Sequence, residues 1–199
     1  MSVFLLSSLL KSVNIHSFAL EARMYVDAYM ADWLRPFVSV GAIAVCAVEM
    51  LVALLALKRG YSRATAAGFF LMLSFFVYLT GANLFFPTVM GSIESCGCFG
   101  ELVHFTPAAS FAKSVALWVT ALVYVVNNCR HKEPWNVIRL LRDRYLYVCT
   151  AASVALPLYS LRGFNEMGHT AYIAGFVALC AVILCVVVWA WRNTSGGDA

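Results

Sequence analysis

Charged residues are scarce in this chain, and most of them lie between long apolar stretches. Lys, Arg, Asp and Glu together make up 12% of the 199 residues, whereas 62% are hydrophobic. A soluble domain is nearer a quarter charged and half apolar. Because the apolar residues form long charge-free runs, the sequence excludes an ordinary soluble domain. It predicts an all-α, polytopic transmembrane helix bundle surrounded by membrane lipid.

Other features are absent as well. Proline occurs only five times, and there is no Pro-rich or Ser-rich linker, low-complexity tract or obvious repeat. The formal net charge of +4 does not indicate a nucleic-acid partner, because the basic residues are concentrated in particular loops. The four histidines do not have the spacing of metal ligands, so they predict no metal site.

Five apolar segments have about the length that crosses a bilayer, which is roughly 20 residues. An earlier segment, 2–10, is apolar but reaches only about half of that length. We interpret it as the second half of a truncated or mis-started helix, or else as a short helix that tilts or inserts part way. It lacks the basic leading region and the cleavage site of a signal peptide. The five predicted spans are 36–57, 64–86, 109–127, 145–161 and 171–191.

The positions of Lys and Arg predict the orientation, since these residues gather on the cytoplasmic side. The 87–108 loop contains neither, whereas the loops after 36–57 and 109–127 are basic. We therefore predict a multi-pass protein of the bacterial inner membrane with cytoplasmic termini and a periplasmic 87–108 loop. The 11–35 segment would lie on the same outer side, as an amphipathic helix at the membrane interface. Its helical spacing is marked by Phe18, Ala22, Tyr25 and Tyr29.

The 87–108 loop holds a close pair of thiols, Cys96 and Cys98, within the peptide Ser-Cys-Gly-Cys-Phe-Gly-Glu. A disulfide across a single residue is strained, and strained disulfides are readily reduced. Gly97 permits the bend that such a bond needs, because it has no Cβ atom. The pair therefore favours thiol–disulfide exchange. Two alternatives stay open, which are a structural disulfide and the binding of Cu(I) by soft thiolates.

Reactive cysteine is the thiolate, which a polar or positive setting favours. Thr106 and Pro107 predict the start of the next helix, with Thr106 as its N-cap. The positive end of that helix would point back to the thiol pair, and His104 and Lys113 would add positive charge. The remaining cysteines, at positions 46, 129, 149, 180 and 185, occur singly and are interpreted as buried small hydrophobic residues.

Glu49 is a carboxylate within the predicted 36–57 span. Such residues are costly in a membrane and usually face a partner or a cavity. One interpretation is a structural group that is protonated or paired. The other is a proton relay or a contact to the head group of a quinone, which is the one cofactor that the sequence suggests. Lys11 is a candidate partner for Glu49, although the sequence spacing does not establish that the two meet.

These residues resemble the MauE branch of the DoxX-like membrane proteins, over roughly residues 1–126. The most specific part is the thiol peptide, which also includes Phe99, Gly100 and Glu101. The resemblance implies that Lys11 pairs with Glu49. It also implies a periplasm-facing redox role in methylamine utilisation, namely the maturation of a disulfide-rich partner. A thioredoxin-like or cysteine-rich periplasmic client is the expected partner.

The chain departs from this pattern after its fourth helix. We predict a four-helix domain at 1–128, a basic cytoplasmic linker at 129–144, two additional transmembrane helices at 145–191 and a disordered tail at 192–199. The outer loops contain no second cysteine pair, so a partner must supply or accept the electrons of a thiol–disulfide oxidoreductase component. Two other functions stay open: a non-enzymatic assembly factor with a structural disulfide, and a copper or small-solute carrier.

Overall fold

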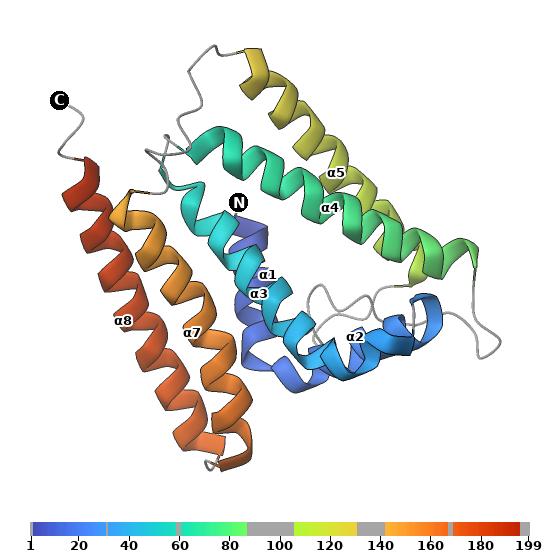
Figure 1. Cartoon of the computed structure of the whole chain (residues 1–199), viewed down its shortest axis with the longest axis horizontal. Coiled ribbons are helices and arrows are strands. Elements are labelled where there is room, and N and C mark those ends of the chain that lie inside the picture. Colours follow the sequence, from blue (N-terminus) through green and yellow to red (C-terminus); the bar gives the residue numbers. More distant parts are fainter. Residues whose placement is uncertain are drawn as a thin grey trace. The chain divides into compact units, whose positions relative to one another are not determined.

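A computed structural model of the chain is built from helices (Figure 1). It describes residues 2–30, 32–58, 61–86, 106–130, 142–166 and 169–195, and these ranges contain no strand. The predicted all-α class is therefore confirmed. The elements are α1 (Ser2–Val13), α2 (Ile15–Tyr29), the 3-10 helix η1 (Asp32–Phe37), α3 (Val38–Leu55), α4 (Ser62–Phe85), α5 (Pro107–Arg130), α7 (Arg144–Glu166) and α8 (His169–Ser195).

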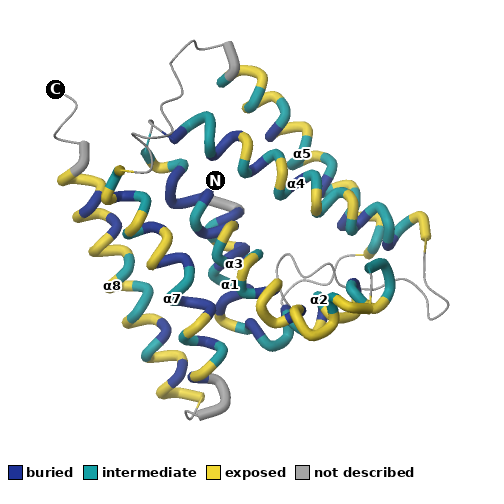
Figure 2. Tube along the Cα trace, in the orientation of Figure 1, coloured by how far each residue is buried: buried dark blue, intermediate teal, exposed yellow. Residues whose placement is uncertain are grey.

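Four helical segments of the described chain are long and apolar enough to cross a membrane, which makes this a multi-pass membrane protein. They coincide with four of the five spans that hydropathy predicts. Their outward side chains are largely apolar, as a lipid-facing surface requires. Figure 2 shows this on α8, where most of the helix is exposed. The four segments are Asp32–Leu55, Ser62–Phe85, Pro107–Asn128 and His169–Asn193.

The other two predicted membrane segments are also helical. The fifth predicted span, 145–161, lies within α7, but α7 is not among the four apolar segments. Its tyrosine and serine side chains lower its hydropathy. The short 2–10 segment lies within α1, a helix of 12 residues that contains the apolar stretch Phe4–Val13. At 1.5 Å per residue, α1 is only about 18 Å long.

The chain forms two compact units. Unit 1 consists of Met1–Ile15, Ile43–Tyr61 and Glu133–Ala199, and it holds α1, most of α3, α7 and α8. Unit 2 consists of His16–Ala42 and Ser62–Lys132, and it holds α2, η1, the start of α3, α4 and α5. The two C-terminal helices are therefore grouped with α1 and α3. The sequence boundaries at 128 and 144 stay a prediction.

The core of unit 1 forms where α3, α7 and α8 pack together. Tyr145 at the start of α7 is fully buried, and its hydroxyl donates to the Leu54 carbonyl at 2.8 Å. That carbonyl lies in the last turn of α3 and also accepts the Leu57 backbone N–H at 3.1 Å. The buried residues of this core are Met50, Leu54, Leu55, Tyr61, Tyr145, Cys149, Ala152, Leu156, Phe176, Val187 and Ala190.

Asp143 joins the end of α3 to the start of α7 within unit 1. Its Oδ2 atom lies 2.6 Å from Lys58 Nζ, and its Oδ1 atom accepts the Tyr145 backbone N–H at 3.0 Å, as an N-cap does. Burial alone would raise the pKa of the Asp143 carboxyl, but hydrogen bonds from Lys58, the Tyr145 backbone and Tyr61 outweigh burial and lower that pKa. The end of α3 and the start of α7 therefore lie next to each other.

In unit 2, α4 and α5 form an antiparallel hairpin (Figure 1). At one end, Asn128 donates its side-chain N–H to the Ser62 carbonyl at 2.9 Å. In the middle, Trp118 Nε1 donates to Ser74 Oγ at 2.8 Å. At the other end, the rings of Phe85 and Phe111 pack edge to face with their centroids 5.5 Å apart. The hairpin therefore brings together the two points from which the 87–105 segment departs.

Candidate functional site

One face of α1 is polar although it is buried. Ser7, Ser8, Lys11 and Ser12 are all less than a tenth exposed. Ser8, Lys11 and Ser12 follow Ser7 by one, four and five residues, which places the four side chains on a single side of the helix. Ser8 Oγ donates to the Leu5 carbonyl of its own helix at 3.0 Å, so the buried Lys11 is the group that most needs a polar partner on another element of unit 1.

The partner of this face is Glu49 on α3. Lys11 Nζ lies 2.7 Å from Glu49 Oε1, and the two side chains are 0% and 2% exposed. Ser7 provides a further hydrogen bond to the same carboxylate. The structure therefore brings together Lys11 and Glu49, the pair that the family resemblance implies.

The pair keeps unused hydrogen-bonding capacity. Glu49 Oε2 and Ser12 Oγ are both buried without a hydrogen-bond partner. A proton that moves from Lys11 Nζ to Glu49 Oε1 would turn the ion pair into a neutral pair without a change of net charge. This arrangement can hold a proton inside the membrane, where an isolated charge is costly.

The described lone cysteines do not form disulfides. Cys46, Cys149, Cys180 and Cys185 are free, and no group of three or more His, Cys, Asp or Glu side chains in the described ranges could hold a metal ion. Cys46 and Cys149 are buried, as we predict. Cys180 is half-buried, and the prediction is wrong for Cys185, which lies exposed on α8. The side chain of Cys129 is outside the described residues.

The thiol peptide itself lies in 87–105, outside the described residues. This applies to Cys96, Gly97, Cys98, Phe99, Gly100 and Glu101. The helix that follows the peptide begins as predicted, with Pro107 as its first residue. Thr106 Oγ1 accepts the Ala109 backbone N–H at 3.3 Å, which is the bond of an N-cap. Lys113 lies half-buried within the first two turns of this helix.

Helix α2 reaches the end of α4 from which the thiol peptide departs. The Tyr29 hydroxyl donates to Asn83 Oδ1 at 3.3 Å, and burial raises the pKa of Tyr29. Of the four residues that mark the predicted face of α2, Phe18 and Tyr25 are buried and Ala22 and Tyr29 are half-buried, and the interfacial position of the helix stays a prediction. Glu21 is buried on the same face and is a residue that the hydrophobic spacing does not reveal.

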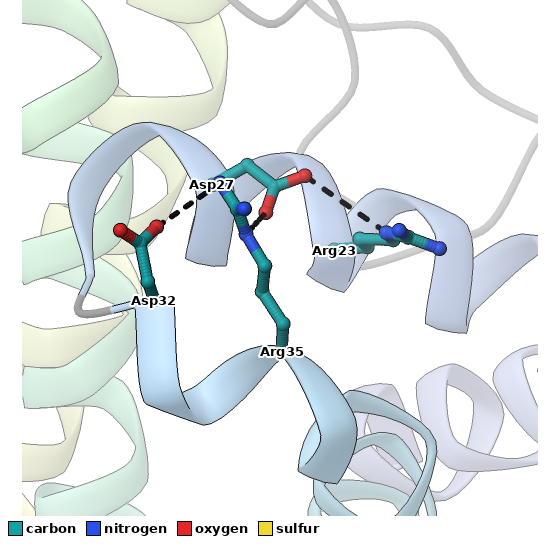
Figure 3. A network of polar contacts seen from close by, with 4 residues as sticks. All are labelled: Arg23, Asp27, Asp32 and Arg35. Carbon is teal, nitrogen blue, oxygen red and sulfur yellow. Dashed lines mark hydrogen bonds and ion pairs between the residues drawn. The ribbon is translucent and has the colours of Figure 1, made fainter.

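A network of ion pairs fixes the turn between α2 and η1 (Figure 3). Arg35 Nε lies 2.6 Å from Asp27 Oδ1, and Arg35 Nη2 lies 3.0 Å from Asp32 Oδ1. Arg23 Nε lies farther off, 3.9 Å from Asp27 Oδ2. Exposed pairs of this kind contribute about 0–1 kcal/mol each, so their effect is mainly to set the direction in which the chain leaves α2.

Sequence reasoning missed several residues of unit 1 that hold polar bonds. The buried serines of α1 could have been recognised from the sequence, because their spacing relative to Lys11 places them on one helix face. Asp143 could also have been recognised, because it precedes a helix as an N-cap residue does. No sequence pattern marks the bond of Tyr172, since its partner is distant in the sequence.

Comparison with known protein families gives a match over most of the chain. Residues 1–127 match the family described as Methylamine utilisation protein MauE. No curated protein and no solved structure matches the chain. The matched residues run from α1 through most of α5, and they include both Lys11 and Glu49. Since the match covers well over half of the chain, this protein is a member of the MauE family of methylamine utilisation proteins.

Proposed function

We propose that this protein is an inner-membrane component that exchanges disulfides with a periplasmic client during methylamine utilisation. Cys96 and Cys98 would be its reacting groups. The observation that carries the proposal is the arrangement at the base of their loop. Phe85 at the end of α4 packs against Phe111 near the start of α5, with ring centroids 5.5 Å apart. Helix α2 is hydrogen-bonded to α4 close by, through Asn83.

The exchange would take place in two steps. The thiolate of one cysteine attacks a disulfide of the client, forms a mixed disulfide and releases one client thiolate. The second cysteine then attacks the mixed disulfide, which releases the client as a dithiol and leaves a Cys96–Cys98 disulfide. Two electrons pass from the membrane protein to the client. The reverse sequence oxidises a client dithiol, and the relative reduction potentials set the direction.

Two features of the described helices support a reactive thiol pair. The capped start of α5 at Pro107 carries the positive end of the helix dipole, which favours a nearby thiolate. Lys113 lies within the first two turns of the same helix and adds a positive charge. The Lys11–Glu49 pair would support the packing of the helices or a proton path during exchange.

The test is to trap the mixed disulfide in the intact protein. In Cys98→Ser, a client that Cys96 has attacked cannot be released, so it should appear as a discrete adduct on a non-reducing gel after acid quenching and alkylation. The adduct should disappear on reduction. The matched controls are the Cys96→Ser/Cys98→Ser double variant and Cys149→Ser, which removes a buried free thiol and should trap nothing.

Other outcomes would point elsewhere. A Cys96–Cys98 disulfide that resists reduction, without any adduct, would indicate an assembly factor whose bond is structural. Thiols that are protected from alkylation only when copper is added would indicate a copper carrier. A membrane-impermeant alkylating reagent added from the periplasmic side should label Cys96 and Cys98 in reduced cells, and a lack of labelling would contradict the proposed topology.

A further inference from the structure

A buried hydrogen bond ties α8 to the end of α1 in unit 1. The Tyr172 hydroxyl donates to the Val13 carbonyl at 2.6 Å, and the tyrosine is only 3% exposed. Val13 is the last residue of α1, and the final carbonyls of a helix have no partner within it. Tyr172 therefore caps α1 from a different helix, across 159 positions of the sequence.

The tyrosine is itself held firmly in place. Its hydroxyl is also hydrogen-bonded to the buried Ser160 Oγ at 3.0 Å. Its ring stacks on that of Tyr159, with centroids 5.9 Å apart and planes 7° from parallel. Gly163 lets this ring approach α7, because a Cβ atom at that position would lie 3.1 Å from Tyr172 Cδ2. These contacts fix the position of the Tyr172 hydroxyl.

The position of the end of α1 matters for the buried pair, because Lys11 lies in the last turn of this helix. Lys11 lies two residues before Val13, about 3 Å along the helix axis. A shift of α1 by a single turn would separate Lys11 from Glu49 and leave both buried charges unpaired.

We infer that Tyr172 is a positioning residue for the Lys11–Glu49 pair, acting through its hydrogen bond to the end of α1. Residue 172 lies outside the residues 1–127 that match the family, so the C-terminal helix pair supplies a contact that the matched part of the chain lacks. The α7–α8 pair thereby serves the buried charges of α1 and α3. This role does not depend on thiol exchange, so either reading can fail without the other.

The test is the infrared band of the Glu49 carboxyl group in the full-length protein, labelled with carboxyl-¹³C glutamate. The band that is lost in Glu49→Gln identifies Glu49. In Tyr172→Phe, which removes only the hydroxyl, this band should shift because Lys11 no longer lies in register. The matched control is Tyr159→Phe, which removes the other hydroxyl of the stacked pair, the one that donates to the Tyr172 carbonyl at 3.4 Å.

The inference fails if the Glu49 band is unchanged in folded Tyr172→Phe, or if Tyr159→Phe shifts it equally. In the latter case the effect would come from general loosening of the α7–α8 pair. If Tyr172→Phe does not fold, 3,5-difluorotyrosine at position 172 keeps the shape and changes only the strength of the donor. That replacement should still shift the Glu49 band, and an unchanged band would overturn the inference.

Discussion

Replacing one member of the Lys11–Glu49 pair should destabilise this protein far more than replacing both. At the observed 2.7 Å separation and an effective dielectric constant of about 20, the attraction between the two charges is about 6 kcal/mol. Removing the ions from water costs several kcal/mol each, so the intact pair contributes little net stability. A single replacement leaves one buried charge uncompensated, which costs about 3–5 kcal/mol.

The measurement is a double-mutant cycle with Lys11→Met, Glu49→Leu and the double variant. The free energy of unfolding is determined in lipid bicelles by steric trapping or by detergent titration. Each single variant should lose about 3–5 kcal/mol. The double variant should recover most of that loss, which gives a coupling energy of at least about 2 kcal/mol.

The same cycle on an exposed pair provides the contrast. Arg23 and Asp27 are separated by 3.9 Å, and their side chains are 64% and 40% exposed. Arg23→Gln combined with Asp27→Asn should show a coupling energy below about 1 kcal/mol. If the effects of Lys11→Met and Glu49→Leu simply add, the two side chains do not act as a buried pair, and the reasoning from their geometry is refuted.

Two further predictions concern the packing of individual helices. Because the pKa of Asp143 is lowered in the folded state, its contribution to stability is present above the unfolded pKa of about 3.9 and is lost as the pH falls through the folded pKa. Unfolding measured against pH should therefore show an acid loss in the wild type that Asp143→Asn lacks, and Asp143→Asn should be less stable at neutral pH by about 1 kcal/mol; identical profiles would contradict the Lys58–Asp143 contact. A Cβ atom at Gly175 would overlap the Tyr159 hydroxyl, so Gly175→Ala should lower the free energy of unfolding by about 1–3 kcal/mol. Gly41→Ala, which meets nothing within 4 Å, should raise it by about 0.5–1 kcal/mol, and equal effects at the two positions would contradict the packing.

The helices of this protein could be predicted from sequence because their signals are local. Hydropathy predicts four segments that the structure confirms as apolar helices of membrane-crossing length. Thr106 and Pro107 predict the start of α5 to the residue, because capping depends on groups only three positions apart. Cys185 was placed wrongly because the residue type does not tell which side of an apolar helix faces lipid.

The contacts between helices required the structure. Lys58 and Asp143 are 85 positions apart, and Tyr172 and Val13 are 159 apart. No periodicity links such residues, since their meeting depends on which helices pack together and at what depth. The sequence makes Lys11 a candidate partner for Glu49, but only the family resemblance implies that the two pair. The grouping of α1 with α7 and α8 has no local signal in the sequence.

The buried pair also has a consequence for how the protein enters the membrane. Lys11 is synthesised before Glu49, and α1 contains no acidic residue that could neutralise it. A lysine at the centre of a membrane helix costs about 2.5–3.5 kcal/mol on insertion, and Lys11, in the last turn of α1, would carry part of that cost. We therefore expect α1 to stay at the bilayer surface during translation. It would move to its final depth only after α3 has been inserted, when Glu49 can pair with Lys11. Since Tyr172 is made later still, its hydrogen bond to the end of α1 would form after the Lys11–Glu49 pair has met.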